Sequence, residues 1–66
     1  MNTQFVPITG LVLAVSHRAV QFNFGNGEVW IPRPFIKETS FPVRHISTWN
    51  IVAWVLEKEM VPIPAS

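Results

Sequence analysis

The sequence predicts a small, mostly β domain of the α+β class, an SH3-like or OB-like antiparallel barrel with one C-terminal helix. Three observations lead to this fold. The 66 residues leave room for a single domain over residues 1–66. A hydrophobic fraction of 48%, with three Trp and five Phe, can supply a core. Segments with apolar side chains at every second position fill the first two-thirds of the chain. A helix-plus-sheet sandwich is the alternative architecture.

The first two strands are expected at residues 8–15 and 19–24. Residues 8–15 are mostly β-branched and aliphatic, and Gly10 within them marks a bulge or a close backbone approach. His17 and Arg18 form a polar break, after which residues 19–24 alternate between apolar and polar side chains. The two segments are therefore expected to lie in one antiparallel sheet.

A hairpin joins the second strand to a third strand at residues 28–31. A two-residue turn at Asn26 and Gly27 gives the best apolar register, because a slip of one residue would move a whole apolar set to the wrong face. The pairs in this register are Phe24 with Val29 and Phe22 with Ile31. Trp30 then lies on the outer face of the sheet, away from the core.

The remaining elements are a fourth short strand at residues 41–46 and a helix at about residues 48–60. Pro32 and Pro34 end the third strand. Pro42 favours an edge position for the fourth strand. Ser47 or Thr48 is expected to be the helix N-cap. The predicted apolar stripe of the helix consists of Trp49, Val52, Ala53, Val55, Leu56 and Met60.

Composition narrows the class of protein further. The chain contains no Cys, which excludes a disulfide-stabilised secreted domain and favours a cytoplasmic location. Its longest apolar run, residues 11–15, is too short for a signal peptide or a membrane span, so neither a targeting segment nor a membrane partner is expected. The net charge of +1 does not by itself indicate nucleic-acid binding.

The side-chain inventory argues against an enzyme. The chain has no Asp, Cys or Tyr, so neither a Ser–His–Asp triad nor a Cys–His pair can be assembled. Its two histidines, His17 and His45, lack the further ligands that a metal site needs. We expect no catalytic residues, no metal and no cofactor.

One group of residues predicts a binding site. In the chosen register Trp30 is exposed near Arg33, and the turn carrying His17 and Arg18 lies close to both. An exposed aromatic ring flanked by cations suits single-stranded nucleic acid, because the ring stacks on a base while the cations meet phosphates. Two further cations complete this candidate site, Lys37 and Arg44. The competing interpretation is that Trp30 covers one end of the barrel or packs under the helix, and that Arg18 and Arg33 are only solvated.

A second candidate surface lies on the predicted helix. Trp54 falls on its polar side, together with Asn50 and Lys58, and Trp is a favoured anchor at protein interfaces. This surface predicts binding of a host protein or of a second copy of the chain. The alternative is that residues 61–64 cover Trp54.

Two segments carry a family resemblance. Residues 19–22, followed by Val29-Trp30-Ile31-Pro32-Arg33, resemble a hairpin of small phage- and prophage-type β-barrel proteins. Residues 51–58 are similar to the short helix that closes such proteins. The resemblance implies a compact barrel of mobile-element origin more than it implies a function. The second functional hypothesis is a phage-type protein that binds or inhibits a host protein through the Trp54 surface. Pro34 stands where these proteins more usually have a polar residue.

Overall fold

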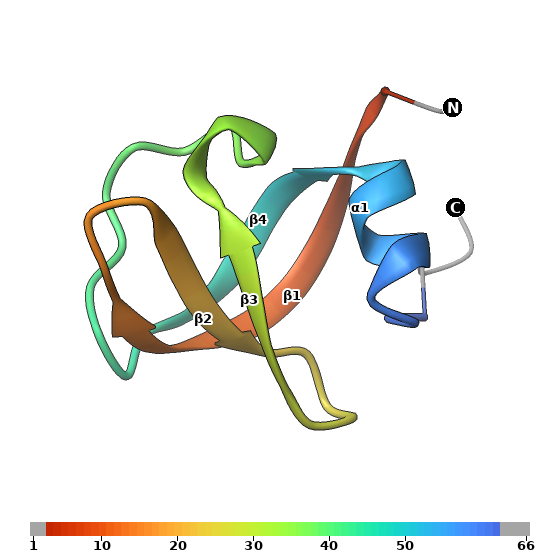
Figure 1. Cartoon of the computed structure of the whole chain (residues 1–66). Helices are drawn as coiled ribbons and strands as arrows, with labels where there is room; N and C mark the ends of the chain where they lie inside the picture. The colour runs from red at the N-terminus through yellow and green to blue at the C-terminus, as the bar shows by residue number, and fades with distance from the viewer. Residues whose placement is uncertain (1–2, 63–66) are drawn as a thin grey trace.

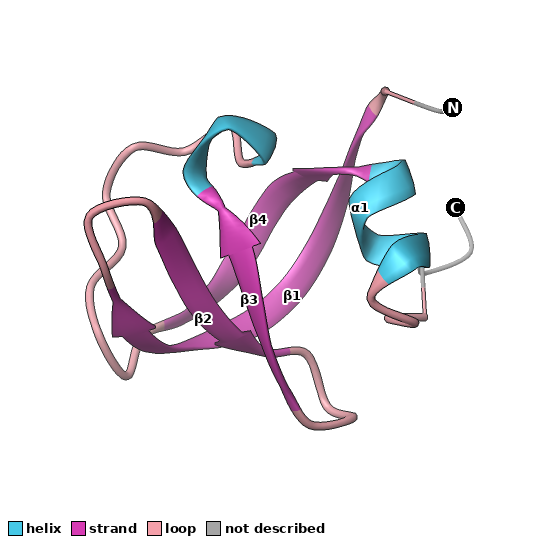
Figure 2. Ribbon diagram, in the orientation of Figure 1, coloured by secondary structure: helices cyan, strands magenta, loops and turns pink. Residues whose placement is uncertain are grey.

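The computed structural model, which describes residues 3–62, contains one antiparallel sheet and a short C-terminal helix (Figures 1 and 2). The four strands lie in the order β3-β2-β1-β4. This arrangement confirms the mostly β class with a helix at the C-terminal end. In chain order the elements are β1 (Phe5–Val15), β2 (Ala19–Asn23), β3 (Glu28–Pro32), the 3-10 turn η1 (Arg33–Phe35), β4 (Ile46–Val52) and α1 (Ala53–Lys58).

The sheet is not closed into a barrel, which corrects the predicted architecture. The strand predicted at residues 41–46 is absent, because Pro42 has no amide hydrogen and Arg44 turns the chain with a positive φ of 68°. Beyond β4 the described residues form an isolated bridge between Ile36 and Ile51 but no further strand. Strands β3 and β4 therefore remain the two ends of the described sheet.

Strand β1 is one of the two inner strands of the sheet and pairs with both β2 and β4. Its first part pairs with β4 from Phe5 to Leu11, and its last part pairs with β2 from Leu11 to Val15. A break in register between Val12 and Ala14 gives the strand an extra residue there, and such bulges bend a strand and increase its twist. Figure 1 shows β1 curving from one partner to the other. The bend lets a single strand organise the whole sheet.

The hairpin between β2 and β3 has a longer turn than predicted. Phe22 pairs with Val29 and Val20 with Ile31, two residues away from the predicted register. Gly25 and Gly27 both have φ of 109°, whereas Asn26 does not have the positive φ that a two-residue type I′ turn requires. Because the shift is an even number, every side chain stays on its predicted face.

An interaction of Asn23 explains where this turn begins. The Asn23 Oδ1 accepts a hydrogen bond of 2.7 Å from the Gly25 amide. Asn commonly starts turns by bonding its own backbone two residues on in this way. The local turn chemistry therefore sets the register, and the apolar pattern alone could not distinguish registers two residues apart.

The predicted helix at residues 48–60 is wrong in its first part. Residues 46–52 form β4, and α1 covers only Ala53–Lys58. Neither Ser47 nor Thr48 is an N-cap, and α1 begins after Val52 without a side-chain cap. Apolar residues at positions 49, 51 and 52 fit the period of a helix as well as that of a strand. Pairing with β1 favours the strand, because it buries Trp49 opposite Ile8.

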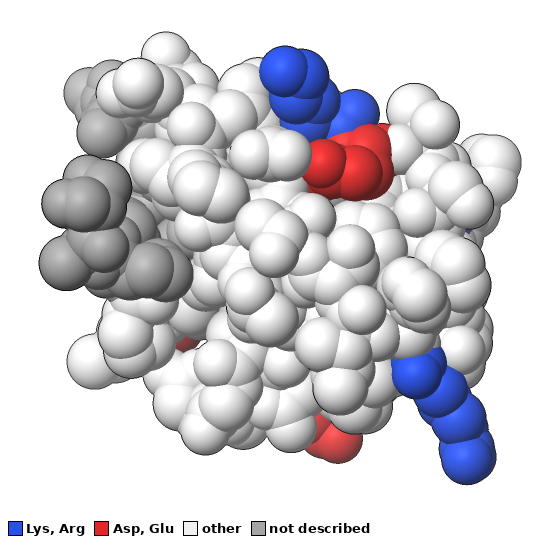
Figure 3. All heavy atoms as spheres, turned by 180° about the vertical axis from the view of Figure 1, so that it is seen from behind, with Lys and Arg blue, Asp and Glu red and all other residues white. Residues whose placement is uncertain are grey.

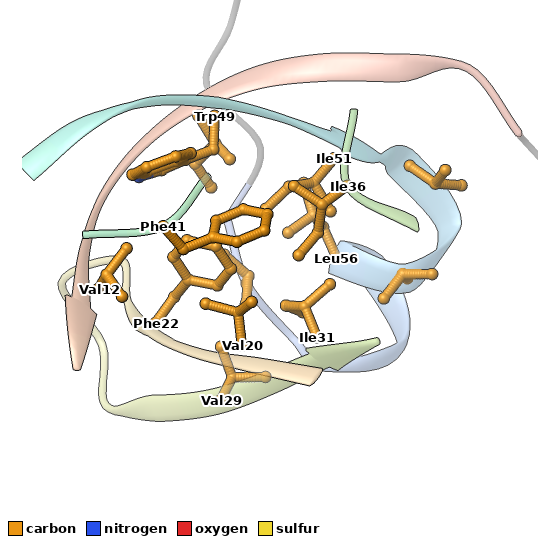
Figure 4. Packing of buried hydrophobic residues seen from close by; sticks show 14 residues of the cluster. Val12, Val20, Phe22, Val29, Ile31, Ile36, Phe41, Trp49, Ile51 and Leu56 are labelled. Carbon is orange, nitrogen blue, oxygen red and sulfur yellow. The ribbon is translucent and has the colours of Figure 1, made fainter. Parts of the chain in front are cut away.

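The core lies between the concave face of the sheet and α1 (Figure 4). Phe22 is fully buried at its centre, with its ring 5.0 Å from that of Phe24 and 5.6 Å from that of Trp49. Leu56 of α1 is also fully buried in the same cluster. The helix and the hairpin thus share one core, whereas Met60 of the predicted apolar stripe, 84% exposed, does not belong to it.

Candidate nucleic-acid interface

Trp30 projects from the outer face of β3, as the hairpin pattern predicts. Its neighbours in the strand, Val29 and Ile31, are buried, and Trp30 itself is 47% exposed. On the adjacent strand its cross-strand partner is Gln21. The indole therefore lies opposite a polar, uncharged residue and keeps about half of its surface in solvent. Because it is held by a strand, it is available without any rearrangement of the backbone.

An open depression of about 440 Å³ lies next along β3. The Arg33 amide donates to the Arg18 carbonyl over 2.9 Å, which extends the β2–β3 pairing past the ends of both strands. This bond holds the turn after β1 against the start of η1. The depression is lined by His17, Arg18, Pro32, Arg33 and Pro34. The structure thus brings together three of the predicted cationic residues, next to the strand that carries Trp30.

Arg33 has a structural role that the sequence did not indicate. Its Nε and Nη2 atoms donate to the Ser16 carbonyl oxygen over 3.1 and 3.0 Å. Its Cζ atom lies 5.4 Å from the centre of the Phe41 ring, a cation–π distance. Arg33 therefore fixes the shape of the depression, and the exposed side chains of His17 and Arg18 are its freer polar groups.

Lys37 and Arg44 are held by other parts of the fold. The Lys37 amide donates to the Asn50 carbonyl on β4 over 2.8 Å. The Arg44 amide donates to the Val12 carbonyl on β1 over 2.7 Å. Neither residue lines the depression. Of the six predicted residues, His17, Arg18 and Arg33 therefore line the depression, with Trp30 beside it. Lys37 and Arg44 lie elsewhere.

The second predicted surface, on the helix, is partly occupied by the protein itself. Trp54 is half-buried, and its ring meets that of Phe35 edge-on at a centroid distance of 5.3 Å. Asn50 belongs to β4 and not to the helix, while Lys58 is exposed in the last turn of α1. Phe35 from η1 therefore covers part of Trp54. The alternative cover by residues 61–64 falls partly on residues 63–64, which lie outside the described residues.

Asn50 is engaged by the carboxylate of Glu38. Its backbone amide donates to Oε1 over 2.8 Å, and its Nδ2 donates to Oε2 over 2.7 Å. Burial of the carboxyl raises the pKa of Glu38, but these hydrogen bonds, together with the charge of Lys37, outweigh burial and leave the pKa below its ordinary value of 4.5. These two hydrogen bonds, which we call the Glu38 clamp, hold the segment after η1 against the outer side of β4. No sequence motif predicted them.

Acid is expected to weaken this clamp. A carboxyl whose pKa is lowered by folding stabilises the protein above its unfolded pKa, and that contribution is lost as the pH falls through the folded value. Thermal unfolding of the wild type should therefore shift to lower temperature as the pH falls below about 4.5. Glu38→Gln should have a lower melting temperature at pH 7 and a smaller loss on acidification. Equal pH dependence in both proteins would contradict the assignment.

The described residues do not contain a group of three or more His, Cys, Asp or Glu side chains that could hold a metal ion. No helix within residues 3–62 has the length and hydropathy needed to cross a bilayer. No family model, no curated protein and no solved structure matches the chain. We therefore infer the function from the geometry of the site.

Proposed function

We propose that this protein is a small binding module for single-stranded nucleic acid, with Trp30 as the stacking platform. The observation that carries the proposal is the 47% exposure of Trp30 on a strand, beside a depression bordered by Arg18 and His17. A base stacked on an aromatic side chain contributes about 1–3 kcal/mol and needs no particular sequence. Arginine and histidine next to the ring supply contacts for the phosphates.

The spacing of the site favours a single strand over a duplex. Trp30 and Pro32 lie on the same face of β3, two residues apart, which corresponds to about 6.7 Å along a strand. Stacked bases in a duplex are separated by about 3.4 Å. One base on Trp30 and the next in the depression, against the apolar rings of Pro32 and Pro34, would therefore have to be unstacked from each other. Single strands adopt such splayed arrangements readily.

The charge of the site predicts a shallow salt dependence. Arg18 and Arg33 are the charged groups there, since Arg33 keeps its positive charge while two of its three guanidinium nitrogens donate to the Ser16 carbonyl. For single strands the logarithm of affinity falls with that of salt by about 0.7 per phosphate contacted. Two phosphate contacts would give a slope of about −1.4. A small slope with a large effect of Trp30 distinguishes a stacking site from non-specific attraction.

A labelled oligothymidine of a few nucleotides, followed by fluorescence anisotropy, tests the proposal. Trp30→Ala should weaken binding about 5- to 150-fold, which corresponds to the loss of one stacked base. Phe5→Ala is the matched control, because Phe5 is also aromatic and 41% exposed but lies at the start of β1. Wild-type protein that does not bind the oligonucleotide at low salt, or equal losses in both variants, would overturn the proposal.

Binding of a host protein through Trp54 has weaker support. Phe35 already packs against that ring, and Asn50 is engaged by Glu38. Two of the three residues predicted for that surface are thus involved in contacts within the chain. The Trp30 indole makes no hydrogen bond or ring contact with another of the described residues.

A further inference from the structure

The side chain of Glu28 lies on the same outward face of β3 as Trp30. Exposed and buried residues alternate along this strand, so Glu28, Trp30 and Pro32 point the same way. Glu28 is two residues before Trp30, which places their Cα atoms about 6.7 Å apart. Pro32, two residues after Trp30, borders the depression that Arg18 and Arg33 line. The indole therefore lies between an anionic end and a cationic end of one surface.

The Glu28 carboxylate is available to accept hydrogen bonds from a ligand. Its cross-strand partner is Asn23, an uncharged residue whose Oδ1 already accepts from the Gly25 amide. Within residues 3–62 the carboxylate makes no ion pair and no side-chain hydrogen bond. Glu28 is also the one charged side chain in the four described strands. Because an ionised carboxylate has acceptor atoms only, the group that it binds must present N–H or O–H donors.

The opposite charges at the two ends of the site orient a nucleotide on Trp30. Phosphates are attracted by Arg18 and Arg33 at the depression and are repelled by Glu28 at the other end. In a nucleotide the Watson–Crick edge of the base points away from the backbone. A base stacked on Trp30 with its phosphate toward the depression therefore turns its Watson–Crick edge toward Glu28.

We infer that Glu28 makes the Trp30 site selective for guanine, an inference that rests on the proposed binding of single strands. Guanine has two adjacent donors on its Watson–Crick edge, N1–H and the N2 amino group, which match the two oxygens of one carboxylate. Adenine and cytosine have a single amino group there, next to an acceptor nitrogen that repels the carboxylate. Thymine has one N–H between two carbonyl oxygens. Proteins commonly read single-stranded bases on this edge.

The rest of the molecule offers little electrostatic attraction that would compete with this contact. The chain carries five basic and four acidic residues. Figure 3 shows the side opposite to the view of Figure 1, where Lys and Arg atoms lie at separate places with uncharged surface between them. A phosphate backbone therefore meets no continuous row of cations there. Binding depends on the short site at Trp30, where one base contact is a large share of the total affinity.

Fluorescence anisotropy with short oligothymidines that carry one guanine or one adenine at the centre tests the inference. Both purines stack on the indole, so the comparison isolates the contact with the base edge. A bidentate contact between a side chain and a base discriminates by about 5- to 150-fold. The wild type should prefer the guanine strand by about 5-fold or more, the lower end of this range, because the site is open to water.

Glu28→Gln should remove this preference by weakening the binding of the guanine strand. Binding of unsubstituted oligothymidine should stay equal or become slightly tighter, because a charge that repels phosphates is lost. Glu57→Gln is the matched control, since it removes the same charge from an exposed position on α1 instead of β3. It should keep the guanine preference. Hypoxanthine in place of guanine lacks the N2 amino group and should abolish the preference in the wild type, without any change to the protein.

Two outcomes would overturn the inference alone. The wild type could bind the guanine and adenine strands equally, with both lost in Trp30→Ala, which would leave the stacking site in place without its selectivity. The preference could also persist in Glu28→Gln, which would assign it to another residue. A wild type that binds none of the strands would overturn the proposed function as well. A guanine preference that is lost in Glu28→Gln and with hypoxanthine, and kept in Glu57→Gln, supports the inference.

Discussion

Trp49→Ala is expected to destabilise the protein by about 3 to 5 kcal/mol, the range found for removing a large aromatic side chain from a core. Trp49 is only 3% exposed, and its ring lies 5.5 Å from that of Phe41 and 5.6 Å from that of Phe22. A domain of this size has a total stability of roughly 3 to 10 kcal/mol. The variant should therefore be largely unfolded at moderate urea concentrations, measured by far-ultraviolet circular dichroism.

The indole nitrogen of Trp49 allows a second, finer test. Its Nε1 donates to the Gly10 carbonyl oxygen over 3.0 Å inside the protein. Trp49→Phe keeps most of the ring contacts but removes this hydrogen bond, at a cost of about 0.5 to 1.5 kcal/mol. Losses below about 1 kcal/mol for Trp49→Ala would show that this side chain is solvated. Such a result would contradict its position on the inner face of β4.

Leu56→Ala is expected to have the second-largest effect, about 2 to 5 kcal/mol. Helix α1 has only six residues, whereas isolated helices shorter than about 12 residues are barely stable in water. The helix must therefore be held by burial of its apolar side, where Leu56 is fully buried. Removing the side chain should release α1 as well as leave a cavity in the core.

Glu57→Ala is the control for this substitution. Glu57 is the next residue along α1 and is exposed, so its removal should change stability by no more than about 0.5 kcal/mol. Urea unfolding gives the free energies of both variants. If Leu56→Ala were as mild as Glu57→Ala, the helix could not share the core of the sheet.

The first three strands illustrate what hydrophobic alternation can predict. The strands at residues 8–15, 19–24 and 28–31 are all present, with β1 starting earlier at Phe5. The outward position of Trp30 was predicted correctly even though the register was wrong by two residues. Alternation has a period of two, so it fixes which face a side chain takes but not which residue lies opposite. The Asn23–Gly25 hydrogen bond, a local contact, determined the register.

The C-terminal third shows where a single sequence is ambiguous. Trp49 and Val52 are spaced as on a helix, while Trp49 and Ile51 are spaced as on a strand. The long β1 offers Ile8 and its neighbours as partners, and this distant pairing decides for the strand. Sequence spacing alone does not contain that information. The same error placed Asn50 on a helix beside Trp54, although Asn50 lies on β4.

The candidate site was predicted in part for a related reason. The β2–β3 hairpin is local in sequence, so Arg18 and Arg33 could be placed near each other from pairing alone. The contacts of Arg33 with Ser16 and Phe41 depend on the path of distant loops, and no sequence pattern revealed them. Lys37 and Arg44 follow irregular segments whose course is set by β4 and β1. Local pairs were therefore predictable, and loop-dependent ones were not.

The most direct test of the functional account is the response of the three indole NH signals in a ¹H–¹⁵N correlation spectrum to a short single-stranded oligonucleotide. The Trp30 signal, assigned by its loss in Trp30→Phe, should shift progressively during the titration, because its ring would take up a stacked base. The Trp49 signal should stay in place, since its NH is bound to the Gly10 carbonyl inside the core. A Trp30 signal that does not move at saturating oligonucleotide would contradict the proposed stacking site.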